Sequence, residues 1–255
     1  MSDFLYQKPL LGTPLDLSNP INRGLVGFWL FNEAGGMKAY DLSGKGNHGT
    51  LTNFAFPSTS TSGWNPGRTG IGLNFDGVDD YVDCGNKSSL DITDVITVEY
   101  WFKTTVGGNP INFAYWNDSN NFFEYVPSVR TDDGRFEDWA YSLKGGVRED
   151  YNIIISNDFR DGLFHHVATI LNASTSIGYL YFDGKYMGSC SFGFTDWAGA
   201  TNASNKFIGR KRSYWFNGGL YCYFTGLIDE VRIYNRALSA EDVKRLYLGL
   251  HPLNK

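Results

Sequence analysis

Short segments with the length of a β-strand recur along this chain about every 8–12 residues, and turn-forming residues separate them. The clearest segment, residues 96–103, alternates strictly. One face carries Ile96, Val98, Tyr100 and Phe102, and the other carries Thr97, Glu99, Trp101 and Lys103. We therefore expect a strand with one face on the core. The spacing favours a sandwich or barrel over alternating strands and helices, and no repeat of fixed period indicates a solenoid or propeller.

Further strands are expected at the other segments of this kind, which are residues 25–31, 71–83, 111–116, 121–126, 139–143, 151–156, 163–171, 177–182, 186–189, 206–209 and 226–234. The dipeptides Asp76-Gly77 and Asp183-Gly184 are hairpin signals. Residues 32–53 are expected to form a loop and residues 54–70 an irregular crossover. The pattern as a whole predicts an all-β fold.

One short helix is expected close to the C-terminus, over residues 239–248. Ser239 can cap its first turn, with Asp242 three residues later as the partner in a capping box. An apolar stripe at helical spacing begins at Val243, and Gly249 follows as a stop signal. This helix would cover one end of the sandwich.

The composition indicates a globular protein and excludes some partners. Glycine accounts for 30 of the 255 residues, aromatic residues for 16% and charged residues for only 19%, which fits many strands joined by tight turns. The formal net charge of −5 argues against a nucleic acid or an anionic membrane as partner. We see no secretory signal before residue 22 and no apolar run that approaches a membrane span, so we expect the chain to be made in the cytosol without a signal peptide.

Residues 1–23 are expected to form an extended N-terminal arm, and residues 24–255 a single domain. The arm carries Pro9, Pro14 and Pro20. Arms of this kind dock on a neighbouring surface or stay loose. The three cysteines, at positions 84, 190 and 222, are too few for a disulfide framework. Two interpretations stay open: three free thiols, or one disulfide and one unpaired thiol.

Several segments carry a resemblance to a known family. They are residues 24–33 with 41–50, residues 73–82 (Leu-Asn-Phe-Asp-Gly-Val-Asp-Asp-Tyr-Val) with 96–102, residues 165–168 and 181–185, and residues 226–239 (Gly-Leu-Ile-Asp-Glu-Val-Arg-Ile-Tyr-Asn-Arg-Ala-Leu-Ser). In order and spacing, residues 24–248 resemble the laminin-G-like domains of the concanavalin A-like jelly-roll superfamily. The resemblance implies an antiparallel jelly-roll β-sandwich of two sheets, and a binding or scaffold role more firmly than catalysis.

A calcium site is the first candidate for chemistry. The glycine-rich loop 41–49 offers the carboxylate of Asp41, the amide of Asn47 and accessible backbone carbonyls, and calcium prefers oxygen ligands of these kinds. If the first and last strands of the domain pair, Asp229 can close the shell, and Glu33 is a further possible donor. The resemblance implies a structural calcium ion in this region.

An alternative reading of the same residues needs no metal. Asp41 and Asn47 would form side-chain turns, and Asp229 would pair with Arg232 or Arg236. The acidic group formed by Asp76, Asp79, Asp80 and Asp83 has the same two readings, as a cation site or as caps of a turn in solvent.

The sequence assigns no catalytic residues. Glucanases of the superfamily carry two glutamates and an aspartate alternating on one strand, and we find no such run. Glu99 stands alone on its strand, and the neighbours Asp229 and Glu230 should face opposite sides of theirs. By the same rule, at most one of His165 and His166 should be buried.

Aromatic residues in polar, loop-like stretches are the candidate ligand-binding residues, because sugars pack their C–H faces on exposed rings. The candidates are Trp116, Trp197, Tyr214 and Trp215, together with Arg212, and Trp139 lies in a similar stretch. Lys211, Arg212 and the aromatics of 213–217 form the densest group.

Two function hypotheses follow. The first is a non-catalytic, lectin-like module that recognises a glycan or glycoconjugate, with calcium as its cofactor. The second is a structural or decoration protein of a virus particle, for example of a phage, in which residues 1–22 clamp a neighbour and support a homo-oligomer or virion assembly. The absence of a visible signal peptide favours the virion hypothesis over the lectin hypothesis. A protein on the virion surface would agree with both hypotheses, because it is made without a signal peptide and later faces the outside. A glycosidase is the weakest alternative.

Overall fold

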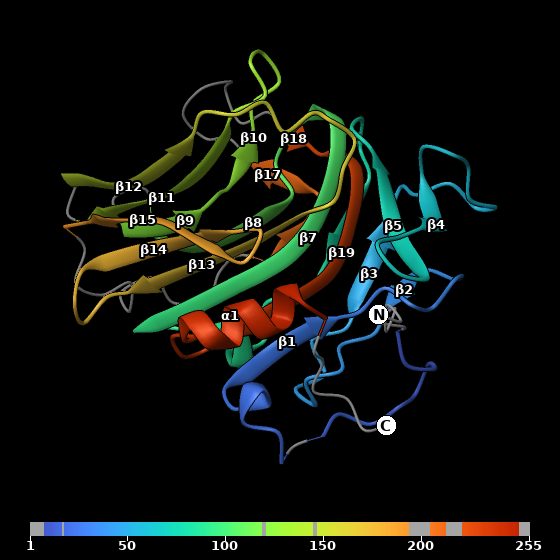
Figure 1. The fold of residues 1–255 in the computed structure, drawn as a ribbon, viewed down its shortest axis with the longest axis horizontal. Coiled ribbons are helices and arrows are strands. Elements are labelled where there is room, and N and C mark those ends of the chain that lie inside the picture. Colours follow the sequence, from blue (N-terminus) through green and yellow to red (C-terminus); the bar gives the residue numbers. More distant parts are fainter. Residues whose placement is uncertain are drawn as a thin grey trace, which may run out of the picture.

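Two antiparallel β-sheets stacked on one another form the body of the computed structural model, which describes residues 8–16, 18–118, 121–144, 147–193, 205–212 and 221–249 (Figure 1). The first sheet has the order β15 (Lys185–Ser191), β14 (Ile177–Phe182), β13 (His165–Asn172), β7 (Val95–Gly107), β19 (Thr225–Tyr234), β5 (Ile71–Asp76) and β4 (Gly63–Pro66), and β1 (Leu25–Trp29) also pairs with β19. The predicted all-β sandwich is confirmed.

The second sheet has the order β10 (Ser128–Val129), β11 (Phe136–Lys144), β9 (Asn121–Tyr125), β8 (Ile111–Asp118), β16 (Phe207–Ile208), β6 (Tyr81–Asp83), β3 (Gly49–Thr52) and β2 (Lys38–Ala39), and β12 (Val147–Ile155) pairs with β11. A separate ribbon joins β17 (Arg210–Arg212) to β18 (Tyr221–Tyr223). Two 3-10 turns lie at Pro20–Asn22 and Ser88–Leu90.

The main hydrophobic core lies between the two sheets. Val98, Tyr100 and Phe102 of β7 are buried in it, as their alternation predicts. The ring centroid of Phe102 lies 5.9 Å from that of Phe136, which belongs to the opposite sheet. Aromatic residues therefore fill much of the space between the layers.

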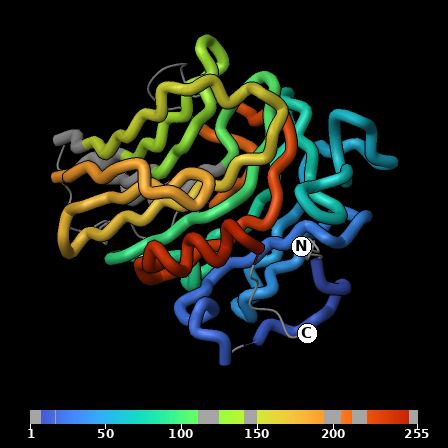
Figure 2. Tube along the Cα trace, in the orientation of Figure 1, coloured from blue at the N-terminus to red at the C-terminus, as the bar shows by residue number. Residues whose placement is uncertain are grey.

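The last strand of the sandwich sits in the middle of the first sheet. β19 pairs with β7 along one edge, and along the other with β5 and then β1. Figure 2 shows this late segment in red beside the green of β7. The predicted pairing of the first and last strands is confirmed, with Trp29 opposite Val231.

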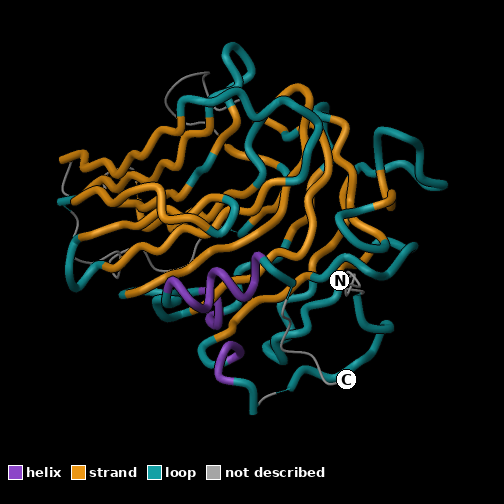
Figure 3. The backbone as a smooth tube through the Cα atoms, viewed as in Figure 1, coloured by secondary structure: helices purple, strands orange, loops and turns teal. Residues whose placement is uncertain are grey.

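The outer face of the first sheet is also covered, which the alternation did not predict. Helix α1 (Ala240–Tyr247) packs across it, over a second hydrophobic cluster that contains Phe28, Ile170 and Leu246. Figure 3 shows this helix in purple across the strands. The expectation that β7 is buried on one face only is wrong, because Thr97, Glu99 and Trp101 are buried as well.

Polar side chains under the helix pair with one another. Glu99 accepts a hydrogen bond from Nε2 of His166 at 2.6 Å and is ion-paired with Arg232, and all three side chains are fully buried. His165 is buried too, on the other face of β13. The prediction that at most one of the two histidines is buried is therefore wrong, since both faces of this sheet are covered.

The predicted helix is confirmed almost to the residue. Ser239 caps it by accepting a hydrogen bond from the backbone of Asp242 at 3.1 Å, and the Asp242 carboxylate accepts one from the backbone of Ser239 in return. Val243 and Leu246 are buried. Gly249 follows with a φ of 72°, a left-handed conformation that glycine adopts readily.

Several short strands were not predicted from the sequence pattern. Residues 32–53, expected as a loop, contain β2 and β3, and the expected crossover contains β4. β10, β17 and β18 were also missed, and each has only two or three residues. Strands of this length show no readable alternation, and their neighbours in space determine them.

The three cysteines are free thiols, with Cys84 buried and the other two half-buried. Among the described residues, no helix is both long and apolar enough to cross a membrane.

Candidate functional site

A groove of about 920 Å³ lies at one end of the second sheet. Its walls come from distant parts of the chain: the turn after β5, the segment after β7, the region from Val126 to Trp139, and the β17–β18 ribbon. We call it the Trp139 groove. Its polar and aromatic lining includes Arg130, Asp132, Glu137, Trp139, Lys211 and Tyr223.

Strand β11 places Trp139 in the groove by simple alternation. Phe136, Asp138 and Ala140 are fully buried toward the core, so Glu137 and Trp139 lie on the opposite face of the strand. Both are half-buried, so part of each side chain is open to a ligand.

Charged groups lie beside the aromatic ring. Nε of Arg130 donates to Oδ1 of Asp132 at 2.9 Å, and Nη1 of Arg130 donates to Oε1 of Glu137 at 3.1 Å. The hydrogen bond from Arg130 holds the pKa of Asp132 below its usual range, so this carboxylate stays ionised and accepts hydrogen bonds. The groove therefore presents both donors and acceptors.

The β17–β18 ribbon forms the facing wall. Lys211 of β17 lies with its Nζ 5.0 Å from the centroid of the Trp139 ring, a cation–π distance. Tyr223 of β18 is half-buried in the same lining. An apolar ring, a second aromatic residue and several hydrogen-bonding groups thus converge on one open surface.

Of the residues that the sequence analysis considered for ligand binding, Trp139 and Lys211 line this groove. Arg212 is the last residue of β17, and Trp116 lies in β8. Tyr214 and Trp215 belong to the segment 213–220 that joins β17 to β18, and this segment lies outside the described residues. Trp197 is also outside them.

Sequence reasoning missed the charged residues and the second ring of the groove, which are Arg130, Asp132, Glu137 and Tyr223. Their positions depend on how residues 128–139 pack against the β17–β18 ribbon. No local sequence motif predicts this packing. One signal was available, since Trp139 alternates with buried residues on a strand and so had to face outward.

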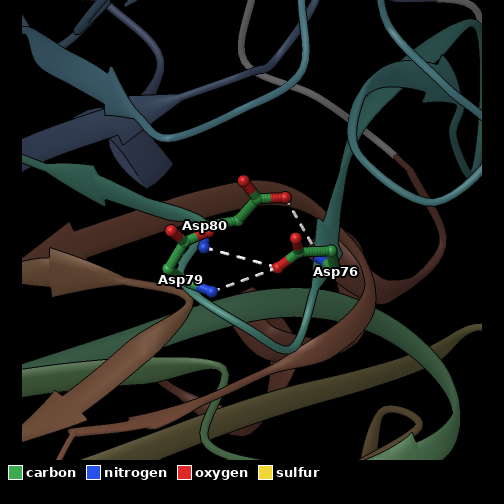
Figure 4. Close-up of side chains that lie close together, drawn as sticks. All are labelled: Asp76, Asp79 and Asp80. Carbon is green, nitrogen blue, oxygen red and sulfur yellow. Dashed lines mark hydrogen bonds between the residues drawn. The ribbon is translucent and has the colours of Figure 1, made fainter.

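The acidic turn after β5 is a hydrogen-bonded turn (Figure 4). Oδ1 of Asp76 accepts from the backbone of Val78 at 2.8 Å. Figure 4 shows that Oδ2 of Asp80 accepts from the backbone of Asp76, at 3.0 Å. The carboxylates of Asp76, Asp79 and Asp80 lie within 4.8 Å of one another. Asp80 is fully buried, and burial raises its pKa to about 6. The contacts of Asp76 fit the turn-capping interpretation, but Asp80 is buried and not in solvent as that interpretation expected.

The four predicted calcium ligands fall into two pairs, and the first pair is committed to other bonds. Asp41 is buried, and its oxygens accept from the backbone nitrogens of Phe28, Ser43 and Asn47 at 2.8–2.9 Å, and from the Ser43 hydroxyl. The side chain of Asn47 donates to the Val26 carbonyl and accepts from Ser89. As placed, this pair does not fit a calcium ion, because its oxygens already have donors.

In the second pair, Asp229 contacts the ammonium group of Lys8, and the charge of Lys8 also acts on the Glu33 carboxyl group. Asp229 is fully buried and forms an ion pair with Lys8, and its other oxygen accepts from the backbone of Arg68 at 3.0 Å. The alternative partners Arg232 and Arg236 bind elsewhere, to Glu99 and to Asp242. A cation is thus present beside Asp229, and it belongs to the chain itself.

The stacked antiparallel sheets, the capped helix over one outer face and the groove at the rim define a jelly-roll β-sandwich domain. The family model of the concanavalin A-like lectin/glucanases superfamily matches residues 76–244. The chain therefore belongs to this superfamily. A search of curated proteins found no match.

Solved structures from two kinds of protein have a similar fold. Domain 4 of AbnA, a GH43 extracellular arabinanase from Geobacillus stearothermophilus solved with arabinotriose, is 20% identical, with a TM-score of 0.61 over 88% of this chain and 98% of that one. The binding domain of Botulinum neurotoxin DC, solved with rat synaptotagmin II, is 13% identical, with a TM-score of 0.61 over 91% of this chain. This chain spans about half, 52%, of that domain.

A structure of botulinum neurotoxin type C also has a similar fold. The cell entry of that toxin is described as dependent on interaction with two ganglioside molecules. The structure is 13% identical, with a TM-score of 0.60 over 91% of this chain and 52% of that one. At these identities the likeness concerns the fold.

Proposed function

We propose that this domain binds a glycan or glycoconjugate in the Trp139 groove and does not cleave it. The observation that carries the proposal is the convergence of Trp139 and Tyr223 with Arg130, Asp132 and Glu137 in one open groove. Sugars present an apolar C–H face and a rim of hydroxyls, and such a lining suits both. The similar structures support it, since one was solved with arabinotriose and another is described with gangliosides.

The electrostatics of the groove favour binding over hydrolysis. Glycoside hydrolysis needs a carboxylic acid whose pKa is raised so that it can protonate the leaving group. The pKa of Asp132 is shifted the other way by Arg130. We therefore expect no release of reducing ends when the protein is incubated with the glycan that it binds, and such release would contradict the proposal.

The direct test replaces the aromatic platform. The wild-type chain is screened on a glycan array, and the affinity for the best ligand is measured by calorimetry. W139A should weaken binding by roughly five- to thirtyfold, because a stacked ring contributes on the order of 1–2 kcal/mol. The melting temperature of the variant should show that it folds.

Y186A is the matched control, because Tyr186 is 55% exposed and lies on β15, away from the groove. It should bind as the wild type does. Equal affinities of W139A and the wild type would rule out the groove as the site.

The second candidate function, a decoration protein of a virus particle, would use residues 1–22 as a clamp on a neighbour. The described contacts of this arm run to its own domain: Asn32 donates to the Pro9 carbonyl at 2.8 Å, and Ile21 is fully buried. These contacts give the glycan-binding proposal precedence.

A further inference from the structure

A lysine from the N-terminal arm ends in a pocket of oxygen atoms inside the domain. The ammonium group of Lys8 donates to the carboxylate of Asp229 and to the backbone carbonyls of Ile71 and Phe31, the last at 3.4 Å. These three acceptors belong to β19, to the start of β5 and to the segment after β1. The side chain of Lys8 is only 4% exposed and that of Asp229 is fully buried.

The Glu33 carboxyl group, on which the charge of Lys8 acts, has one oxygen that is not hydrogen-bonded to the described residues. Oε1 of Glu33 accepts from the backbone of Tyr40 at 2.7 Å, while Oε2 is buried and has no hydrogen-bond partner among the described residues. The charge of Lys8 is close enough to act on this carboxyl group, although burial has the larger effect and raises its pKa. One carboxylate and two backbone carbonyls thus contact the positive charge, and the charge also acts on a second carboxyl group.

The pocket is shaped closely around Asp229. A Cβ atom on Gly67 would lie 2.5 Å from the Asp229 carboxylate, and one on Gly72 would lie 3.4 Å from it. The turn between these glycines therefore closes over the acid. A carboxylate enclosed in this way needs a cation, because an uncompensated charge in the interior costs several kcal/mol.

We propose that Lys8 serves as a built-in cation, which takes the place of a metal ion in this oxygen pocket and fastens the arm to the domain. Carboxylates and backbone carbonyls are the ligands that calcium prefers, and here they are gathered from three separate segments. An ammonium group has three donors, and each finds an acceptor in a different segment. The chain thus supplies through Lys8 the charge that the predicted metal would supply.

The proposal has a specific consequence for a chain without this lysine. In K8A, the pocket keeps Asp229, Glu33 and the carbonyls of Phe31 and Ile71 but loses its cation. The pocket should then accept calcium from solution, with water completing the shell. The wild type should gain no calcium there, because Lys8 competes from within the same molecule.

The experiment titrates calcium chloride into full-length wild type and K8A by calorimetry, and follows melting temperatures with and without calcium. K8A should melt below the wild type in a chelator and should recover about 5 °C or more at saturating calcium. It should bind one calcium ion that the wild type does not bind. The double variant K8A/D229N should lose this binding.

K87A is the matched control. Lys87 also donates to a backbone carbonyl, that of Gly46 at 2.6 Å, but it is exposed. Its removal should create no new calcium binding. The proposal is overturned if K8A binds no more calcium than the wild type, if calcium fails to restore its fold, or if the added binding survives in K8A/D229N. None of these outcomes bears on the Trp139 groove, which W139A tests separately.

Discussion

At the scale of single residues, the most unusual group is a carboxylate inside the core. Asp138 is fully buried between the sheets, and it accepts hydrogen bonds from the hydroxyls of Tyr125, Tyr151 and Thr169 at 2.7–2.9 Å. These bonds join β9, β11 and β12 of one sheet to β13 of the other. Burial raises the pKa of Asp138 to about 6, against the smaller opposing effect of the hydroxyls.

This shift predicts a pH dependence of stability. Because the folded pKa lies above the unfolded value of about 3.9, the folded state binds the Asp138 proton more tightly. The contribution of Asp138 to the free energy of unfolding should therefore fall by roughly 2–3 kcal/mol as the pH rises from about 4 to about 7.5. D138N, which does not titrate, should lack this part of the pH dependence.

Urea denaturation of both proteins at several pH values measures the difference. Other groups with raised pKa values, such as Asp80 and Asp229, are common to both proteins and cancel. E241Q, at an exposed carboxylate, is the control and should follow the wild type. Parallel pH curves for the wild type and D138N would contradict the prediction.

At the scale of elements, helix α1 shows what local chemistry can specify. Its capping box and its terminal glycine are contiguous in the sequence, so the helix could be predicted with its boundaries. The ribbon β17–β18 could not, because three-residue strands are determined by their partners. The same reason hides Arg130 and Tyr223 of the groove, whereas the aromatic character of Trp139 was visible.

The cap makes a quantitative prediction. S239A should lower the free energy of unfolding by about 1 kcal/mol, because a backbone donor of the first turn loses its acceptor. S60A, at an exposed serine in a loop, should change it by less than about 0.5 kcal/mol. Chemical denaturation of the wild type, S239A and S60A measures these differences. Equal midpoints for S239A and the wild type would show that the cap does not stabilise the fold.

At the scale of the whole molecule, the first sheet has a protected centre. β7 pairs with β13 and with β19, and its polar outer face is closed by α1. The sequence predicted the strands and the two-layer arrangement, but it did not show that both faces of this sheet are covered. That difference explains the buried Glu99, His166 and Arg232, which simple alternation would place in solvent.

Hydrogen exchange should reflect this arrangement. Backbone amides of β7, β13 and β19 should exchange most slowly, since they lie in the middle of the sheet. Those of β15, whose side chains are largely exposed at the end of the sheet order, should exchange faster. Mass spectrometry of exchanged peptides measures both, and equal protection of β15 and β7 would contradict the expected gradient.

The central position of β19 also constrains how the chain is made. While the ribosome is still adding residues before 225, β7 lacks one neighbour and β1 has no partner strand, so the emerging chain exposes an open gap in its first layer. Closure must wait for the last strand, which enters between segments synthesised long before it. A nascent chain stalled before this strand should therefore remain a client for chaperones, and one released after it should not.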